Sequence, residues 1–357
     1  MKRPEQAPEL KDLLNGGLPT WSPDTMELAK EYNSRYLHWS DLEYRDVGPD
    51  SRETLWALMK ILREGTIRTV EFDDLVIGYN ITDNAQRILH DLDMRLSSGL
   101  VPSSILDEKR RLMLTVGSIM EESIASSQLE GASTATKVAK KMLRENTAPR
   151  DISERMIVNN YNAMRFIKEH SGDKLSPDLI RKIHSLISCG TLDDARYEGR
   201  FRDDNSIAVH DVFTGETYHE PPDFNRIPDL VQALCDFAND DSVFVHPIVK
   251  GIVLHFVLAY IHPFMDGNGR VSRSLFYWYL MRNGYSSVEY ISISKAIKSH
   301  HGRYNNAYLL SETDGNDITY FINYNLDMVF EAADAFLSYI RPVSYTHLRA
   351  HETRHDL

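Results

Sequence analysis

The chain has 357 residues, of which 42% are hydrophobic and 26% charged. This composition is typical of a soluble globular protein with one large or two ordinary domains. The formal net charge of −12 argues against a general affinity for nucleic acid, which requires clustered lysine and arginine.

Three features indicate the cellular compartment. The two cysteines, Cys189 and Cys235, are too few for a disulfide framework. The N-terminal sequence MKRPEQAPEL is polar and lacks the apolar core of a secretory signal. The most apolar stretch, residues 247–261, is shorter than the ~20 residues that span a bilayer. We therefore expect a cytoplasmic protein that does not cross a membrane.

Helical patterns predominate in the first hundred residues. They occupy three ranges, 24–36, 52–64 and 82–97. The second range ends at Gly65, and glycine commonly closes a helix. Residues 67–79 are rich in β-branched side chains and indicate either a short hairpin or an irregular link. We expect residues 1–103 to form a helical N-terminal region that packs on the rest of the chain.

A long amphipathic run covers residues 104–129 and is predicted to be one helix. Its apolar positions recur at roughly helical spacing, at Leu106, Leu112, Leu114, Ile119 and Ile124. The run stops at Glu130-Gly131, where the glycine suits a left-handed helix end.

The rest of the chain is also predicted to be mainly helical. Helical patterns occupy residues 134–145, 152–170, 177–188, 226–238, 270–283, 294–311 and 316–341. A further helix, 247–261, begins at a proline and is apolar on nearly all sides, which indicates full burial. Residues 200–219 instead alternate loosely around Thr214-Gly215, as a β-hairpin does. The predicted fold class is therefore all-α, with one small β-hairpin.

The dodecapeptide HPFMDGNGRVSR at residues 262–273 concentrates groups that carry chemistry. An imidazole titrates near neutrality, so His262 could accept a proton from a hydroxyl. Asp266 is a hard oxygen ligand of the kind that binds magnesium. The glycines around Asn268 let backbone N–H groups converge on an anion. Arg270 and Arg273 share one face at the start of the following helix, where the helix dipole favours phosphate.

Each of these residues also has an ordinary structural interpretation. A lone histidine is more often structural than catalytic, and an aspartate before glycine is a common turn former. The Gly-Asn-Gly sequence could be a simple tight turn, and two arginines three residues apart could be a solvated helix face. Their grouping within twelve residues favours instead a transferase that handles a nucleotide.

The dodecapeptide resembles the signature of the Fic-domain family, HxFx(D/E)GNGRxxR, at every fixed position. The resemblance extends over residues 105–330 and is strongest over 199–273. It implies a Fic-type helical bundle over residues 104–341. It also implies a protein adenylyltransferase, which transfers AMP from ATP to a serine, threonine or tyrosine hydroxyl of a target protein.

The same resemblance implies a role for each residue of the motif. His262 is the expected general base, and Asp266 is the expected Mg²⁺ ligand. The remaining motif residues are expected to contact the phosphates of ATP: Gly267, Asn268 and Gly269 the α- and β-phosphates, Arg270 the charge that develops on them, and Arg273 the γ-phosphate.

Two further segments resemble parts of the family on either side of this motif. Gly199-Arg200-Phe201-Arg202 and the hairpin at 207–218 resemble its flap, whose strand edge could align a target segment by backbone pairing. Residues 303–307 (RYNNA) resemble a stretch around the adenine, in which Tyr304 is the expected contact. Two adjacent tyrosines are frequent there, and this chain has Asn305 in the second place, so base preference stays open.

Residues 126–131, SSQLEG, match the family's inhibitory motif, (S/T)xxxE(G/N), and close the helix predicted at 104–131. The resemblance implies an N-terminal inhibitory helix of the class II type. Glu130 would pair with Arg273 and occupy the guanidinium that should hold the γ-phosphate, and Ser126 would steady this pair. In some family members the matching glutamate helps water to remove AMP from the target, so a reverse activity is open here. Self-modification and a homodimer are further expectations.

The last residues differ in composition from the rest. His351-Glu-Thr-Arg-His355 fits the zinc-protease pattern HExxH, but the chain ends two residues later and offers no third ligand downstream. Residues 342–357 are polar, rich in histidine and arginine, and resemble translated non-native sequence. We therefore interpret them as a non-native tail and expect the natural protein to continue beyond about Arg341.

Two alternatives to the adenylyltransferase stay open at this point. The same scaffold could transfer another nucleoside monophosphate or a phosphate-bearing group. The chain could also be a non-catalytic nucleotide-binding regulator with a decayed site, although the intact motif counts against decay.

Overall fold

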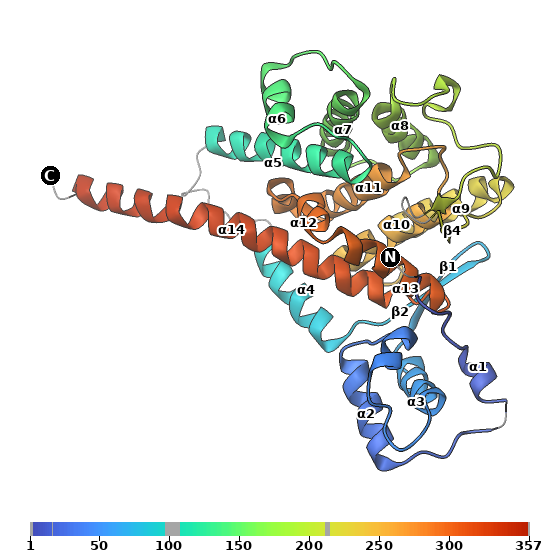
Figure 1. Ribbon diagram of the computed structural model, residues 1–357. Coiled ribbons are helices and arrows are strands. Elements are labelled where there is room, and N and C mark those ends of the chain that lie inside the picture. Colours follow the sequence, from blue (N-terminus) through green and yellow to red (C-terminus); the bar gives the residue numbers. More distant parts are fainter. Residues whose placement is uncertain (1–2, 16, 97–107, 211–214, 356–357) are drawn as a thin grey trace. The chain divides into compact units, whose positions relative to one another are not determined.

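The structure, a computed structural model, describes residues 3–15, 17–96, 108–210 and 215–355, with side chains described as far as residue 340. Helices dominate these residues, and the strands among them pair into two short antiparallel hairpins (Figure 1). The predicted mainly helical class is confirmed. The chain divides into two compact units: the first comprises residues 1–87, 209–219 and 302–324, and the second comprises 88–208, 220–301 and 325–357.

Helices α2 (Pro23–Ser34) and α3 (Arg52–Glu64) organise the N-terminal part of the first unit. Each is capped by a serine, Ser22 or Ser51, whose hydroxyl accepts a hydrogen bond from the backbone N–H three residues later. Trp56 is fully buried in the apolar cluster that these helices share. The short helices α1 (Leu10–Leu13) and η1 (Trp39–Tyr44), which no sequence pattern indicated, border the same cluster.

Both hairpins belong to the first unit. Strands β1 (Arg68–Phe72) and β2 (Leu75–Tyr79) pair directly, so residues 67–79 form a hairpin and not an irregular link. Strands β3 (Val209–His210) and β4 (Thr217–His219) form the hairpin predicted within 200–219. Its predicted turn at Thr214-Gly215 lies partly outside the described residues, and Gly215 itself has a positive φ of 70°.

Helix α13 (His301–Thr313) and the start of α14 (Thr319–His355) complete the first unit. Buried Arg63 of α3 donates to the hydroxyl of Tyr320 at 2.9 Å, and that hydroxyl donates to Asp314 at 2.9 Å. Lys60 forms an ion pair with the same carboxylate at 2.9 Å. This buried polar network anchors the turn between the two helices on α3.

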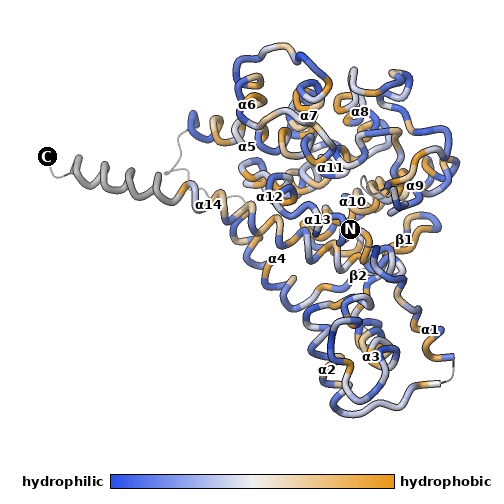
Figure 2. The backbone as a smooth tube through the Cα atoms, viewed as in Figure 1, coloured by the Kyte–Doolittle hydropathy of each residue, from blue (hydrophilic) through white to orange (hydrophobic). Residues whose placement is uncertain are grey.

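Helix α10 (Pro247–Ile261) is the core of the second unit, and its residues are buried over nearly the whole length, as predicted. It packs along α11 (Asn268–Arg282). The surrounding helices are α5 (Glu108–Leu129), α6 (Thr136–Glu145), α7 (Ile152–Glu169), α8 (Pro177–Ser188), η2 (Ala195–Tyr197), η3 (Phe224–Arg226), α9 (Ile227–Asn239), η4 (Ser286–Tyr290) and α12 (Ile293–Ser299). Helix α4 (Asp83–Leu96) contributes residues to both units. Blue and orange alternate along most of the helices in Figure 2, as expected when one face is buried.

Several helix boundaries differ from the sequence prediction by one to three residues, and the following differences have the most effect. Helix α11 begins at Asn268 and not at residue 270, because Gly267 adopts a left-handed conformation (φ 85°) directly before it. The helix predicted over 294–311 is two helices, since the chain leaves the helical conformation at His300. Helix α14 continues past residue 341 to His355, where side chains lie outside the described part. The division at residues 103 and 341, and the non-native tail, therefore stay predictions.

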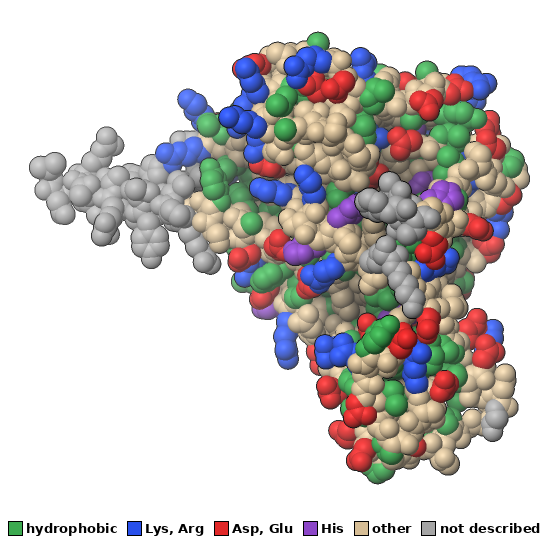
Figure 3. Space-filling view, viewed as in Figure 1, with side chains coloured by type: hydrophobic (Ala, Val, Ile, Leu, Met, Phe, Trp, Pro, Cys, Tyr) green, Lys and Arg blue, Asp and Glu red, His purple; other side chains and the backbone are tan. Residues whose placement is uncertain are grey.

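None of the helices in the described ranges combines the length and the hydropathy needed to cross a bilayer. On the face of the molecule in Figure 3, acidic and basic side chains are interspersed.

Candidate active site

The histidine of the motif ends the central helix. His262 closes α10 in a left-handed conformation (φ 49°, ψ 57°), and its N–H donates to Leu258 O at 3.0 Å. Its ring nitrogen Nδ1 lies 3.2 Å from Ala259 O. A carbonyl oxygen can only accept, so Nδ1 must carry the hydrogen in this contact. The neutral ring then has its lone pair on Nε2, which is the form that can take up a proton.

Asn268 closes the loop that follows His262. Its Oδ1 accepts from the N–H of Phe264 at 2.9 Å, and its Nδ2 donates to the carbonyl of the same residue at 2.8 Å. Both side chains are buried. The amide of Asn268 thus holds the loop in shape, whereas its predicted contact with phosphate stays a prediction. The backbone N–H groups at the start of α11 belong to the helix end that favours an anion.

A buried histidine on α8 supports this loop from the other side. The ring of His184 stacks on Phe264, with 3.7 Å between ring centres. Its Nδ1 accepts from Gly199 N–H at 3.0 Å, so its Nε2 must donate to Asp266 O at 2.9 Å. Burial lowers the pKa of His184 to about 4, which keeps the ring neutral. Sequence reasoning missed this residue, although it shares the buried face of α8 with Ile180, Ile183 and Ile187.

Arg202 connects the backbone of the loop to the segment that leads into and out of the hairpin. Its N–H donates to Pro263 O at 2.9 Å and its Nε to His262 O at 3.0 Å. The guanidinium also donates to the carbonyls of Asp204, at 2.8 Å, and of Pro222. The side chain is buried. The sequence indicated Arg202 only as part of the flap resemblance, and its contacts with the loop were not predicted.

The first turn of α11 carries the cationic end of the site. Arg270 is fully buried, donates to Asp266 Oδ2 at 3.2 Å, and approaches Ile187 O at 3.4 Å. Burial lowers the pKa of its guanidinium. Its Nε has no hydrogen-bond partner within the described residues, and such an orphaned buried donor is uncommon. The carboxylate of Asp266 is 57% exposed.

The C-terminal end of α5 reaches this turn. Arg273 Nη2 donates to Glu130 Oε1 at 2.7 Å, and the same guanidinium donates to Ser126 Oγ at 2.9 Å and Ser126 O at 3.1 Å. A Cβ atom placed on Gly269 would lie 2.2 Å from Glu130 Oε1. The carboxylate therefore rests against the backbone of the first turn of α11, where only glycine leaves room for it.

The pKa of Glu130 is lowered by the cations of the motif. Burial alone would raise it, but the positive charge and hydrogen bond of Arg273 outweigh burial and hold the pKa below its usual value. Arg270 and His262 lower it further. The contacts of this carboxylate are with Arg273 and with the backbone at Gly269, both in the first turns of α11.

The second unit therefore brings together most of the predicted site residues: Ser126, Glu130, His262, Asp266, Gly267, Asn268, Gly269, Arg270 and Arg273. Tyr304 belongs to the first unit. It is buried there, with Tyr308 edge-on at 5.2 Å between ring centres and Phe321 at 6.1 Å. Its assignment to the adenine, like the role of the hairpin as a flap, stays a prediction.

Comparison with known proteins identifies the family of this region. Residues 174–280 match the Fic/DOC family. These residues form a Fic domain. The present chain is similar to protein adenylyltransferase Fic of Drosophila willistoni, with 33% identity over 120 residues. It is also similar to protein adenylyltransferase fic-1 of Caenorhabditis elegans, with 31% identity over 133 residues. These matches cover 33% and 35% of the present chain but only 22% and 24% of the two relatives.

Solved Fic proteins have the same fold. Residues 134–508 of Fic-1 from C. elegans superpose with a TM-score of 0.59 at 19% identity, over 89% of this chain and 85% of that one. A Fic family protein from Desulfovibrio desulfuricans also superposes with a TM-score of 0.59, at 18% identity, over 71% of this chain and 73% of its own.

Proposed function

We propose that this Fic-domain chain is a protein adenylyltransferase that transfers AMP from ATP to a serine, threonine or tyrosine hydroxyl of a target protein. The observation that carries the proposal is the short segment in which His262 ends α10 and the first turn of α11 presents Arg270 and Arg273, with the carboxylate of Glu130 bound to Arg273 against Gly269. A base beside two cations at a helix N-terminus is what nucleotidyl transfer to a hydroxyl requires. The names of the relatives support the same activity.

In the proposed reaction, His262 Nε2 accepts the proton of the target hydroxyl. The oxygen attacks the α-phosphorus, a new oxygen–phosphorus bond forms, and the bond to the β-phosphate breaks, so that pyrophosphate leaves. Arg270 and Arg273, with the N–H groups at the start of α11, hold the β- and γ-phosphates and orient the α-phosphorus toward the imidazole. The orphaned Nε of Arg270 is a donor that such an anion could satisfy. Positioning and electrostatics then supply most of the rate enhancement.

Asp266 is the residue that would hold Mg²⁺. Its exposed carboxylate beside Arg270 suits a hard cation that is shared with phosphates. The described residues contain no group of three or more histidine, cysteine, aspartate or glutamate side chains that could hold a metal by itself. One exposed carboxylate fits Mg²⁺ that takes its other ligands from the substrate and water, which is how this ion is commonly bound. When bound, the ion neutralises charge on the leaving pyrophosphate.

We further propose that Glu130 inhibits the enzyme. It occupies Arg273, the predicted partner of the γ-phosphate, and its carboxylate lies against Gly269 in the predicted phosphate cradle. A negative charge in that place would repel the triphosphate or force it into a pose unsuited to attack. Ser126 strengthens the arrangement because it binds the same guanidinium.

Replacing Glu130 with glycine tests the proposal. Purified wild type, Glu130→Gly and Glu130→Gly/His262→Ala are incubated with Mg²⁺ and ATP labelled at the α-phosphate, alone and with a cell lysate. We expect more incorporation into the chain itself or a lysate protein with Glu130→Gly than with wild type. Incorporation should vanish in the double variant, while nucleotide binding persists. A folded Glu130→Gly protein that labels no more than wild type would refute the inhibition. Unchanged labelling after loss of His262 would remove the histidine from the mechanism.

The same assay distinguishes the alternatives. Competition by unlabelled GTP, CTP and UTP shows whether another nucleotide is preferred, which the asparagine at position 305 leaves open. Nucleotide binding without labelling by any variant would favour a non-catalytic regulator. Removal of AMP from a labelled target by wild type, but not by Glu130→Gly, would show the reverse activity. Self-modification, a homodimer and a cytoplasmic location stay predictions.

A further inference from the structure

A second carboxylate lies on the same face of α5 as the proposed inhibitory residues. Glu122 and Ser126 lie four residues apart on α5, and Glu130 follows at the same interval in the turn directly after the helix, so the three form one stripe. Glu122 accepts a hydrogen bond from Tyr277 on α11, and Ser126 accepts one from Arg273 a helical turn earlier on α11. The stripe thus runs antiparallel to α11, with Glu122 at one end and Glu130 at the other.

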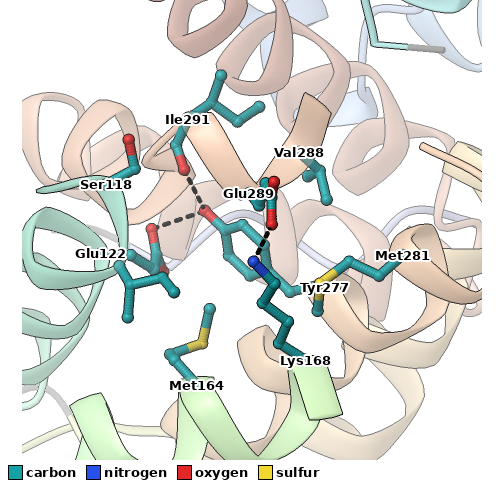
Figure 4. Close-up of a pocket in the computed structure, with 10 residues that line it drawn as sticks. Ser118, Glu122, Met164, Lys168, Tyr277, Met281, Val288, Glu289 and Ile291 are labelled. Carbon is teal, nitrogen blue, oxygen red and sulfur yellow. Dashed lines mark hydrogen bonds and ion pairs between the residues drawn. The ribbon is translucent and has the colours of Figure 1, made fainter. Parts of the chain in front are cut away.

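Glu122 is buried and has more hydrogen bonds than Glu130. Its Oε2 accepts from Tyr277 OH at 2.7 Å, Ser294 N–H at 2.9 Å and Ser292 Oγ at 3.0 Å, and its Oε1 accepts from Ser294 Oγ. Figure 4 shows Glu122 and Tyr277 directed toward each other, with the carbonyl of Ile291 beside the same hydroxyl. The donors come from α11 and from the start of α12, so one carboxylate joins three helices.

This network can fix the position of α5 along its own axis. Apolar neighbours on α5, such as Ile119 and Ile124, are held by contacts that have no preferred direction and tolerate sliding. Hydrogen bonds to a carboxylate weaken steeply when distance or angle changes. From Glu122 to its end at Leu129, α5 spans about 10 Å, and a helix transmits a shift at one end to the other and so to the turn that holds Glu130. The 2.7 Å bond between Glu130 and Arg273 would be lost after a shift of about one ångström.

We propose that Glu122 is the positioning residue for autoinhibition. By anchoring α5 on Tyr277 and the start of α12, it holds Glu130 within reach of Arg273. This inference rests on the proposed function and adds to it a second residue, eight positions before the inhibitory glutamate, through which inhibition depends on the packing of α12.

Glu122→Gln is the appropriate substitution because it keeps the shape of the side chain. The amide is uncharged and has one acceptor oxygen, so every remaining bond loses its charge assistance, and the hydroxyl of Ser294 must turn to accept from the NH2 group. The matched control is Glu121→Gln, an adjacent carboxylate on α5 that pairs with Lys140 on α6 and, at 3.8 Å, with the exposed Lys295 on α12, and that accepts from none of the donors of Glu122. An exposed ion pair of this kind contributes little to the packing of α12. Tyr277→Phe removes one donor to Glu122, together with the acceptor of the Ile293 N–H, and serves as a second variant, which carries the test if Glu122→Gln does not fold.

Incorporation of AMP is measured for each variant with and without Glu130→Gly. We expect Glu122→Gln to raise incorporation on the order of tenfold, the effect of losing a hydrogen bond to a charged group. Tyr277→Phe should raise it less, and Glu121→Gln should leave it unchanged. In the Glu130→Gly background, Glu122→Gln should add less than about twofold, because nothing remains to be positioned. An equal effect in both backgrounds, or no rise where Glu130→Gly alone is active, overturns the inference and leaves the proposed function intact.

Hydrogen exchange of the ligand-free protein provides a readout that does not depend on activity. The backbone amides of residues 126–131 at the end of α5 should exchange faster in Glu122→Gln than in wild type or Glu121→Gln. If this acceleration occurs but no variant incorporates AMP, the proposed function fails and the positioning of α5 by Glu122 stands. If exchange over these residues is unchanged, the inference fails whatever the activity.

Discussion

Replacing Arg202 with alanine would separate the loop that carries His262 from the segment that supports it. The side chain is 3% exposed and donates to the carbonyls of His262, at 3.0 Å, and Asp204, at 2.8 Å, and to that of Pro222. Each carbonyl left without a partner in a buried place costs about 1–3 kcal/mol. Because water can reach some of them after truncation, we expect a total loss of about 2–4 kcal/mol in the free energy of unfolding.

The effect on activity should exceed the effect on folding. The guanidinium binds the carbonyl of His262 itself, so its loss lets the imidazole move relative to the first turn of α11. A displacement of about 1 Å at a reacting group can reduce a rate about a hundredfold. Arg202→Lys keeps the charge but cannot reach three carbonyls with one ammonium group. Its activity should therefore lie between those of wild type and Arg202→Ala.

Two measurements on the same variants test this expectation. Urea unfolding gives the stability of Arg202→Ala, Arg202→Lys and the control Arg200→Ala, whose exposed side chain lies two residues away and should change stability by less than about 0.5 kcal/mol. Incorporation of AMP is measured in the Glu130→Gly background, at a temperature where every variant is folded. The reasoning is wrong if Arg202→Ala unfolds at the same urea concentration as wild type and, in the Glu130→Gly background, incorporates AMP as fast as Glu130→Gly alone.

Other residues of the site give further expectations. Chelation by EDTA should abolish incorporation of AMP and leave thermal unfolding of the ligand-free protein unchanged; a chelator-dependent loss of fold would contradict the assignment of Mg²⁺ as a substrate-shared ion. Asp266→Ala should also abolish incorporation, but it should lower the unfolding temperature, because buried Arg270 loses its carboxylate partner. Because the pKa of His184 is about 4 in the folded protein and 6.5 is its ordinary value, the unfolded chain binds its proton more readily. Its contribution to stability is therefore complete above pH 6.5 and is lost as the pH falls toward 4, by about 2 kcal/mol at pH 5. Urea unfolding at pH 7 and pH 5 should show a smaller decrease for His184→Gln than for wild type, and an equal decrease would rule out the histidine as its source.

The sequence predicted best what is contiguous along the chain. The all-round apolar pattern of residues 247–261 predicted a buried helix, and α10 is that helix. The groups of residues 262–273 lie together because a single loop and helical turn carry them. The start of α11 was misplaced by two residues, since Asn268 forms its bonds backward to Phe264 and the helix begins with it. The break at His300 has no glycine or proline before it, so no local signal ended the predicted helix there.

Residues that act through tertiary contacts were not predictable in the same way. Arg202 reaches carbonyls 60 residues away, and Glu122 accepts from groups more than 150 residues away. His184 looked like any polar residue on an amphipathic helix, because the partners that make it useful, Gly199 and Asp266, belong to other elements. A pattern within one element indicates which face is buried, but it does not identify the groups that meet there.

The double hydrogen bond between Asn268 and the backbone of Phe264 has a consequence for ligand binding. The loop is already closed in the ligand-free protein, so an incoming anion does not have to order it, and little conformational entropy is lost on binding. A rigid cradle of this kind should discriminate among anions by size and shape, since it cannot expand around a poor fit. The anion would then bind without rearrangement of this loop, and any slow step in binding would be a movement of α5.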